Sequence, residues 1–415
     1  MNTWDKRESF LIILGCANDQ IPAYKKAREL GIKTIGVDYN PDAPAFDYCD
    51  LPLLVSVKHP DQLIPALEKV NNEFNFLGVM TLGVEISPMV SMVADKFGLI
   101  AVDEVTAFLT TNKCARSMRL DEQGIPIPCY QVLKDTSNIK METPFVIKPS
   151  DSSASRGVRR VDRREDIKPA FDIAKELATD DRVLIEELLK GNEISIEGFM
   201  LNSKMYVTGF SDRNYATIPN SVSQPYFIED GSDLPSRLPH DIQKQACKVF
   251  ELAVLACGIT DGPSKGDLLV QDGIVYVIEV TSRLSGGGFC SRSQGMVNGT
   301  DIVTATIQWH CGMEVDVDLV TPKYSNPVCH RFYFHEPGII TDIKGIDTIK
   351  EMPGVVHYVE QYPFTIGDEL EPVCYINRLF YIYTDGDTIE EAIKNAENAI
   401  ASVEITTEDS PLTFV

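Results

Sequence analysis

Two carboxylates are expected to face each other across a β-hairpin in this chain of 415 residues. Two β-like runs flank the turn Gln271–Gly273, with Asp267 at the start of the first run and Glu279 at the end of the second. Like charges directly opposite each other destabilise a strand pair, so a cation is expected between them. Mg²⁺ typically takes one or two carboxylates together with substrate phosphates. The alternative is that one carboxylate points to solvent.

A lysine and a loop of small residues follow a short apolar strand. Lys148 lies near the end of the predicted strand Phe145–Pro149, and the loop after it contains Ser153, Ser155 and Gly157. Backbone amides and hydroxyls of such a loop can cover phosphates, and a lysine adds a point charge. The Walker A pattern is absent, and a Ser-rich loop alone is more often a solvated turn. This loop therefore predicts phosphate binding only in combination with the neighbouring motifs.

An arginine and three glycines follow Glu279 closely along the chain. Arg283 is four residues beyond it, and Gly286–Gly288 come next. Glycines allow a backbone to approach a ligand closely. An arginine beside a metal site suits phosphoryl or acyl-phosphate transfer, because negative charge builds on oxygens in the transition state.

The first 112 residues alternate predicted strands and helices, which favours a parallel, doubly wound sheet. Ligands of such sheets bind beyond the carboxyl ends of the strands. Asn18, Asp38 and Glu85 each follow a predicted strand and are expected to face that crevice. Turn roles for Asn18 and Asp38, and a helix-dipole role for Glu85, are the alternatives.

The composition excludes several classes of protein. With 38 Lys and Arg against 61 Asp and Glu, the net charge is −23, which disfavours nucleic acid and anionic membranes as partners. No run of 18 apolar residues predicts a transmembrane helix, and no secretory signal is evident. The ten cysteines show neither a C-x-x-C pair nor zinc spacing, so reduced thiols in the cytoplasm are expected.

The order of these motifs resembles the ATP-grasp superfamily, and the resemblance covers nearly the whole chain. The matching segments, in chain order, are Lys113, Lys148–Pro149 with its loop, Ile185–Glu193, Asp267 and Ile278–Gly288. The sequence is similar to the branch that contains biotin carboxylase, the formate-dependent glycinamide ribonucleotide transformylase and the L-amino acid ligases. The resemblance implies a mixed α/β fold. It would comprise a Rossmann-like pre-ATP-grasp domain (1–112), a mobile central lid subdomain (113–188) and a C-terminal ATP-grasp subdomain with a closing segment (189–415).

The resemblance also implies which residues bind ATP. In chain order these are Lys113 and Lys148 for the phosphates, Ser153, Ser155 and Gly157 in the loop that closes over them, Glu186, Glu187 and Leu189 for adenine, and Glu193 for ribose. Lys148 is also expected to take part in catalysis.

Two Mg²⁺ ions, with Mn²⁺ as a substitute, are implied at Asp267 and Glu279. The family usually has Glu at the first metal position and Asn two residues after the second, where this chain has Asp267 and Thr281. The shorter carboxylate can still coordinate Mg²⁺, whereas threonine is a poorer ligand than an asparagine carbonyl. Arg283 matches the arginine that steadies an acyl phosphate.

The resemblance implies an ATP-dependent carboxylate–amine ligase that forms an amide or peptide bond. A substrate carboxylate would attack the γ-phosphate, and an amine would displace phosphate from the resulting acyl phosphate. Two alternatives stay open: an ATP-dependent carboxylase or formyl-type transferase, and a non-catalytic ATP-binding regulator. Gly287 lies four residues after Arg283, a region in which biotin carboxylases keep a glutamate, and this argues against carboxylase chemistry.

The expected partners are a small-molecule carboxylate, a small-molecule amine and a second copy of the chain in a homodimer. The residues expected to contact substrate are Glu85, Arg283, Gly287, Arg292 and Arg331. A cationic pocket would suit a carboxylate substrate, although surface or ion-pair roles are the alternative for Arg292 and Arg331. His330 and His335 are expected to be structural.

Overall fold

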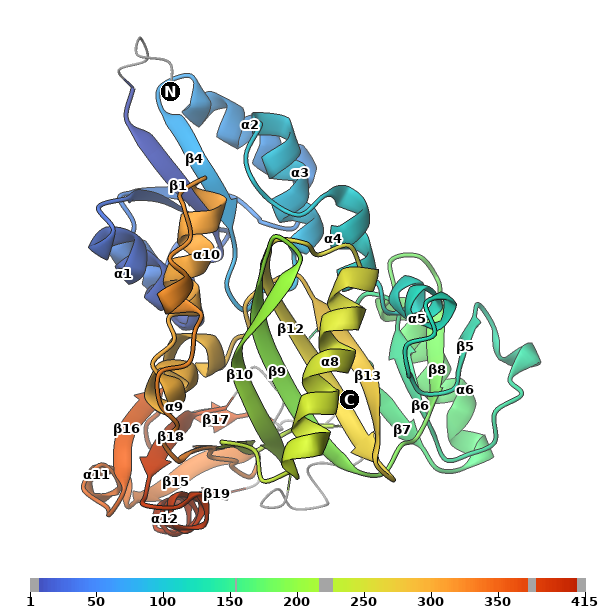
Figure 1. Ribbon diagram of the computed structural model, residues 1–415. Helices are drawn as coiled ribbons and strands as arrows, with labels where there is room; N and C mark the ends of the chain where they lie inside the picture. Colours follow the sequence, from blue (N-terminus) through green and yellow to red (C-terminus); the bar gives the residue numbers. More distant parts are fainter. Residues whose placement is uncertain (1–6, 154, 216–226, 372–377, 409–415) are drawn as a thin grey trace.

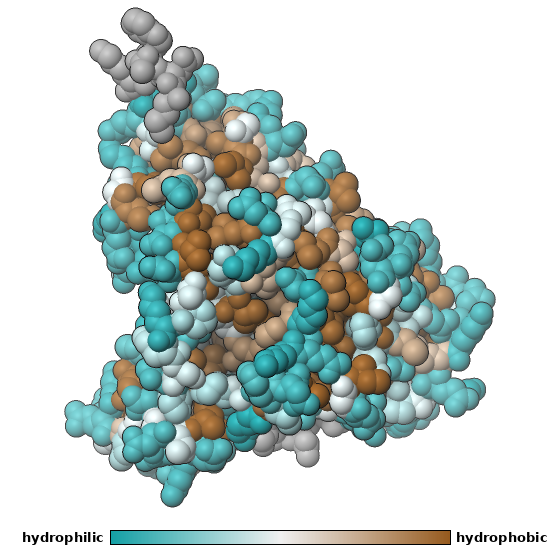
Figure 2. All heavy atoms as spheres, in the orientation of Figure 1, coloured by the Kyte–Doolittle hydropathy of each residue, from teal (hydrophilic) through white to brown (hydrophobic). Residues whose placement is uncertain are grey.

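The protein is described by a computed structural model that covers residues 7–153, 155–215, 227–371 and 378–408. It is a mixed α/β structure with four sheets (Figure 1). Hydrophilic residues cover most of the outer parts of the face in Figure 2, whereas hydrophobic residues gather toward its centre. Among the described residues, no helix combines the length and apolar character needed to cross a membrane.

The first sheet is parallel, as the alternation of strands and helices predicts. Its order is β3-β2-β1-β4, from β1 (Ser9–Leu14), β2 (Lys33–Asp38), β3 (Leu51–Leu54) and β4 (Asn75–Met80). The helices of this region are α1 (Ile21–Glu29), α2 (Pro60–Asn71), α3 (Ser87–Phe97) and α4 (Glu104–Thr111). Strands β1 and β2 are largely buried, which explains their continuous apolar runs.

A helix from late in the chain completes this first core. Helix α10 (Ile302–His310) packs against α1 and β4 (Figure 1). Ile302 and Ile307 share one apolar cluster with Leu11 and Ile13. Gly78 allows this approach, because a Cβ at that position would clash with the backbone carbonyl of His310.

A small four-stranded sheet follows helix α5 (Lys113–Glu122). Its order is β5-β8-β6-β7, from β5 (Tyr130–Leu133), β6 (Phe145–Pro149), β7 (Arg159–Val161) and β8 (Val183–Glu187). Helix α6 (Ile167–Leu177) packs on it through Phe171 and Ala174. This sheet carries Lys148 and Glu186 toward the site described below.

The largest sheet has eight strands in the order β13-β12-β9-β10-β11-β14-β18-β16. They are β9 (Asn192–Leu201), β10 (Lys204–Asn214), β11 (Gly231–Leu234), β12 (Gly262–Gln271), β13 (Ile274–Thr281), β14 (Val328–Phe332), β16 (Val355–Glu360) and β18 (Phe380–Asp385). Helix α8 (His240–Ala256) covers part of this sheet, with Phe250 fully buried (Figure 1).

The C-terminal part adds a three-stranded sheet in the order β17-β15-β19 and three helices. The strands are β15 (Gly338–Lys344), β17 (Glu369–Leu370) and β19 (Glu404–Glu408), and the helices are α9 (Gln294–Asn298), α11 (Ile346–Ile349) and α12 (Ile389–Ala401). A π-helical turn, Phe289–Ser293, leads into α9.

The predicted hairpin is confirmed as β12 and β13. Its register places Asp267 directly opposite Glu279. Asp272 and Gly273 both have positive φ, at 53° and 79°, as a two-residue turn that matches strand twist requires. The hairpin therefore holds the two carboxylates side by side.

Candidate active site

A cavity of about 530 Å³ is lined by residues from the N-terminal region, from the sheet β5-β8-β6-β7 and from the eight-stranded sheet. Its size falls within the range of about 300–1,000 Å³ that is usual for small-molecule sites. The charged residues that line it, among those described, are Lys113, Arg116, Lys148, Arg213, Lys265, Arg283 and Arg378 on the positive side and Asp19, Glu85, Glu186, Glu187, Glu193, Glu229, Asp267 and Glu279 on the negative side. The cavity thus brings together charges of both signs in nearly equal number, within a chain of net charge −23.

Most of the residues predicted from the sequence line this cavity. They are Glu85, Lys113, Lys148, Ser153, Ser155, Glu186, Glu187, Leu189, Glu193, Asp267, Glu279, Arg283 and Gly287. The predicted residues that are not part of its lining are Gly157, Thr281, Arg292 and Arg331. Residue 154, in the middle of the predicted phosphate loop, lies outside the described residues.

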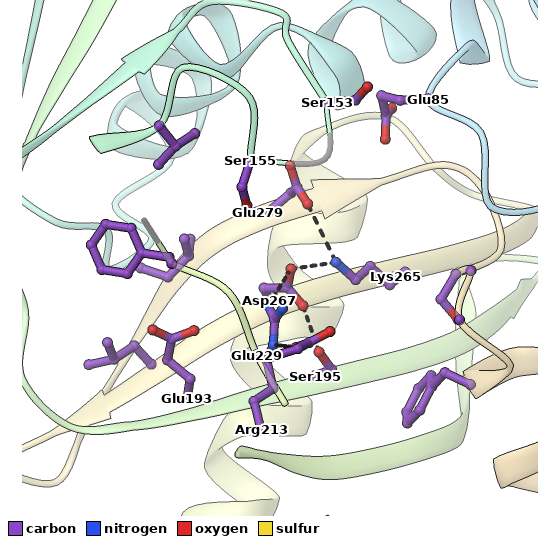
Figure 3. Close-up of a pocket in the computed structure, with 18 of the residues that line it drawn as sticks. Glu85, Ser153, Ser155, Glu193, Ser195, Arg213, Glu229, Lys265, Asp267 and Glu279 are labelled. Carbon is purple, nitrogen blue, oxygen red and sulfur yellow. Dashed lines mark hydrogen bonds and ion pairs between the residues drawn. The ribbon is translucent and has the colours of Figure 1, made fainter. Parts of the chain in front are cut away.

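The cation expected between the two hairpin carboxylates is an ammonium group of the protein itself. Lys265 pairs with Asp267, and its Nζ lies 3.4 Å from Glu279 Oε2 (Figure 3). Lys265 and Asp267 are two residues apart on β12, so they share one face of the sheet. Ser195 Oγ on β9 donates to Asp267 Oδ1 at 2.7 Å.

Arginines from other elements add positive charge around the same carboxylates. Arg213 Nη1 on β10 lies 3.0 Å from Asp267 Oδ2, and Arg213 also pairs with Glu229 (Figure 3). Arg116 Nη2 on α5 lies 3.9 Å from Glu279 Oε1. These positive charges favour the ionised form of the Asp267 and Glu279 carboxylates.

Both hairpin carboxylates stay ionised at neutral pH. Burial would raise the pKa of Glu279, but Lys265 and Arg116 outweigh it and hold the pKa well below its usual range. The pKa of Asp267 is also lowered, because Arg213 and Lys265 overcome the effect of burial.

The donor set fits Mg²⁺ bound jointly with a phosphate ligand. Among the described residues, no group of three or more His, Cys, Asp or Glu side chains is arranged to hold a metal alone. Two ionised carboxylates are enough for Mg²⁺, which usually completes its shell with phosphate oxygens and water. Thr281 is 1% exposed, and its Oγ1 has no hydrogen-bond partner within the described ranges. Thr281 is not among the residues that line the cavity, which favours two protein ligands rather than three.

Lys113 anchors the loop predicted to cover phosphates. Its backbone N–H donates to Ser150 O at 2.6 Å, and its Nζ donates to Ser152 O. Burial lowers the pKa of Lys113, with Glu279 acting in the opposite direction. Gly157 has φ of 75°, and a Cβ there would clash with Leu177 and Pro149, which assigns it a backbone role in this loop.

The second predicted phosphate lysine forms an ion pair with the residue predicted to contact adenine. Lys148 on β6 pairs with Glu186 on β8, and both side chains are largely buried. Glu193, predicted to contact ribose, accepts a hydrogen bond from Tyr215 at 2.5 Å. Roles of these residues toward ATP stay predictions.

Two residues that follow strands β1 and β4 of the N-terminal sheet close the cavity against the segment Arg283–Gly288. Arg283 Nε donates to Glu85 Oε2 at 2.7 Å, and Asp19 Oδ2 accepts from Gly287 N at 2.9 Å. The Asn18 side chain instead donates to Gln361 O, and Asp38 accepts from Cys16 N and from Asn40 N. The expectation for the carboxyl edge of this sheet therefore holds for Glu85, whereas Asp38 has the alternative turn role through Asn40, and Asn18 makes a long-range contact outside the cavity lining.

The two remaining substrate-contact predictions are not supported by the geometry. Arg331 is 2% exposed and pairs with Asp233 at 2.7 Å, which is the ion-pair alternative. Arg292 lies in the π-helical turn near Tyr381 and outside the cavity lining. The neighbouring His330, predicted to be structural, does line the cavity, whereas His335 bonds to Glu371 O.

A buried carboxylate beneath the glycine segment has an unusual protonation state. Glu197 is fully buried on β9, where Oε1 accepts from Ser285 N at 2.7 Å and Oε2 accepts from Ser285 Oγ at 3.0 Å. Gln294 also donates to it. Burial raises the pKa of Glu197 to about 7, although these hydrogen bonds oppose the shift.

Glu197→Gln is expected to change how stability depends on pH. The folded state binds the Glu197 proton more tightly than the unfolded state does, so wild-type stability falls as pH rises from about 4.5 to about 7. The wild type should lose roughly 3 kcal/mol relative to the variant across this range. Denaturant unfolding of both proteins at pH 5 and pH 8 measures this difference. Parallel pH dependence in the two proteins would contradict the assignment.

Comparisons with known proteins agree with this arrangement. Residues 141–293 match the ATP-grasp domain family, and residues 330–408 match the family described as L-amino acid ligase C-terminal domain 2. The chain is 29% identical over 186 residues to a carbamoyl-phosphate synthase of Methanobrevibacter smithii, covering 43% of this chain and 48% of that protein. It is 25% identical over 270 residues to a formate-dependent phosphoribosylglycinamide formyltransferase of Wolinella succinogenes, covering 62% and 65%. The matches thus span about half to two thirds of these relatives.

The fold also matches a solved structure over nearly its full length. An L-amino acid ligase from Bacillus licheniformis superposes with a TM-score of 0.82 at 21% identity, covering 98% of this chain and 100% of that one. At this identity the likeness concerns the fold. The matches therefore identify residues 141–293 as an ATP-grasp domain and residues 330–408 as an L-amino acid ligase C-terminal domain 2, within a chain that has the fold of that solved structure.

Proposed function

We propose that the protein is an ATP-dependent carboxylate–amine ligase that releases ADP and phosphate. The observation that carries the proposal is the convergence of Lys113, Lys148, Lys265 and Arg283 with the Asp267–Glu279 pair on one cavity. This charge pattern suits a triphosphate and an acyl phosphate, because both spread negative charge over several oxygens.

The chain's residues act mainly by positioning and by neutralising charge. A substrate carboxylate attacks the γ-phosphorus, the bond to the β,γ-bridging oxygen breaks, and ADP leaves. The amine then attacks the acyl carbon, phosphate leaves with the bonding electrons, and the ammonium proton passes to solvent or phosphate. Arg283 lies where it can steady the acyl phosphate, and the loop around Ser153 and Ser155 excludes water from it.

Asp267 and Glu279 would hold Mg²⁺, which when bound supplies positive charge to the phosphates. We expect two ions, with Mn²⁺ as a substitute, as in the family that the sequence resembles. Thr281 is a candidate outer contact rather than a direct ligand, since it is buried and does not line the cavity.

A formyl-type transferase is the second candidate, supported by the similarity to formate-dependent phosphoribosylglycinamide formyltransferases. A carboxylase is disfavoured by Gly287, which offers no side chain to act on bicarbonate. A non-catalytic ATP-binding protein is disfavoured by Arg283, which such a protein has less need to keep beside a metal site.

Phosphate release from ATP and Mg²⁺ tests the proposal directly. The twenty proteinogenic L-amino acids and a set of small carboxylates are supplied singly and in pairs, with formate and bicarbonate in separate reactions. Stimulation that needs one carboxylate and one amine supports a ligase. Stimulation by formate or bicarbonate alone supports the second candidate, and ATP binding without turnover overturns both.

Three further expectations belong to this proposal. We propose domain limits of 1–112, 113–188 and 189–415; each sheet lies within one of these ranges, although α10 packs back on the first. We also expect a homodimer in the cytoplasm. Light scattering on the purified protein tests the dimer.

A further inference from the structure

One wall of the cavity comes from strand β14, inside the matched L-amino acid ligase domain. His330 and Phe332 alternate with Arg331 along this strand, so they share the face opposite to it. Both line the cavity, whereas Arg331 pairs with Asp233. The strand therefore presents an imidazole and a phenyl ring to any ligand bound there.

His330 is held rigidly but has an unused polar atom. Its ring stacks on the Tyr383 ring, with centroids 4.6 Å apart and an angle of 14° between the planes. The centroid of the Phe332 ring lies 4.4 Å from that of His330. The residue is 4% exposed, and its Nε2 has no hydrogen-bond partner within the described part of the chain. A buried polar atom without a partner carries a desolvation cost that no hydrogen bond offsets. A ligand atom in the cavity would remove that cost.

Arg378 brings a guanidinium group to the same wall. Its Cζ lies 3.7 Å from the centre of the Phe332 ring, and Nη2 donates to Glu229 O at 2.7 Å. Arg378 lines the cavity although it is only 3% exposed. A guanidinium held over a ring is well suited to a carboxylate, because its fork of N–H groups matches two oxygens.

We propose that His330, Phe332 and Arg378 form the subsite that selects one of the two substrates. This substrate is an amino acid or short peptide with a carboxylate for Arg378, an apolar or aromatic body against Phe332, and a polar side-chain atom for His330. The inference rests on the proposed ligase function and deepens it.

The protonation state of His330 supports the same role. Burial, together with Arg378, Arg331 and Arg292, lowers the pKa of this imidazole well below its usual range. A neutral imidazole exchanges a hydrogen bond with a ligand without adding charge. It therefore suits discrimination between a polar side chain and its apolar isostere, such as tyrosine and phenylalanine.

His330→Phe tests the subsite, because it keeps the ring and removes the polar atoms. Phosphate release is measured with the proteinogenic L-amino acids in pairs, and KM is determined for ATP and for each substrate. The variant is expected to raise KM for one substrate at least tenfold and to reduce its preference over the apolar isostere. KM for ATP should stay unchanged. Arg378→Gln should raise KM for the same substrate.

His357→Phe is the matched control. His357 is exposed and does not line the cavity. Its ring also contacts Tyr383, with ring centroids 6.2 Å apart. Its KM values should equal those of the wild type. If His330→Phe destabilises the fold, His330→Gln replaces it, and partial recovery of the polar preference is expected.

The possible failures are distinguishable. Unchanged substrate KM values in His330→Phe, with an active wild type, overturn the subsite and leave the proposed ligase intact. Effects of His330→Phe and Arg378→Gln on two different substrates also overturn it. A wild type that no pair of substrates stimulates overturns the proposed function, and the subsite falls with it.

Discussion

Glu279→Gln is expected to lower kcat at least 100-fold and also to lower thermal stability, because Lys265 and Arg116 lose a charged partner. The substitution preserves the size of the side chain but removes the charge that faces Lys265 and Arg116. A metal–phosphate complex then loses one of the two hairpin carboxylates, and the loss of one well-placed electrostatic contact costs about 10²–10³ in rate. Phosphate release gives kcat, and titration with Mn²⁺ followed by electron paramagnetic resonance gives metal affinity in the presence of nucleotide.

Asp272→Asn is the control for this prediction. Asp272 lies in the turn of the same hairpin, outside the cavity, and asparagine tolerates its positive φ of 53°. This variant should keep wild-type kcat and Mn²⁺ affinity. A Glu279→Gln enzyme within tenfold of wild-type kcat, with unchanged Mn²⁺ affinity, would show that the hairpin does not hold the metal.

Local spacing was enough to predict the hairpin and the pairing of its two carboxylates. The Asp272–Gly273 turn sets the register, and the register places Asp267 opposite Glu279. The sequence also required a cation between them, but the spacing argument suggested only a metal. Lys265 could have been found by the same argument, because residues two apart on a strand share a face.

Residues brought in from distant strands could not be predicted in this way. Arg213 reaches Asp267 through the pairing of β9 with β10 and β12, and no motif marks it in the sequence. Arg378 reaches the cavity only because β14 pairs with β18. Such placements depend on sheet order, which spacing along one strand does not determine.

The His330–Arg331 pair shows a second limit of sequence analysis. Strand alternation requires these two residues to face opposite sides, but not which of them faces the cavity. A cationic substrate pocket favoured Arg331, whereas the fold pairs Arg331 with Asp233 and turns His330 inward. Which face of β14 points to the cavity is therefore decided by Asp233, the buried partner of Arg331 on β11, 98 residues earlier in the chain.

Arg283→Met is expected to reduce kcat about 100- to 1,000-fold while the affinity for ATP stays within about threefold. The guanidinium lies at the cavity and is bound on one side by Glu85, with Arg283 Nη2 2.5 Å from Glu85 Oε2. Under the proposed mechanism, removing it takes away a charge that acts on the acyl phosphate rather than on bound ATP, so the loss should appear in kcat. Phosphate release and calorimetric titration with a non-hydrolysable ATP analogue separate the two effects.

The same substitution leaves Glu85 buried without its partner, since that side chain is 9% exposed. Breaking a buried ion pair from one side costs about 3–5 kcal/mol, so Arg283→Met alone should also unfold at lower denaturant concentration. The double variant Arg283→Met/Glu85→Gln removes the uncompensated charge and should recover most of this stability without recovering kcat. If the double variant recovers both stability and kcat, Arg283 has a structural role only. If it recovers stability but not kcat, the effect of Arg283 on the substrate is separate from its pairing with Glu85.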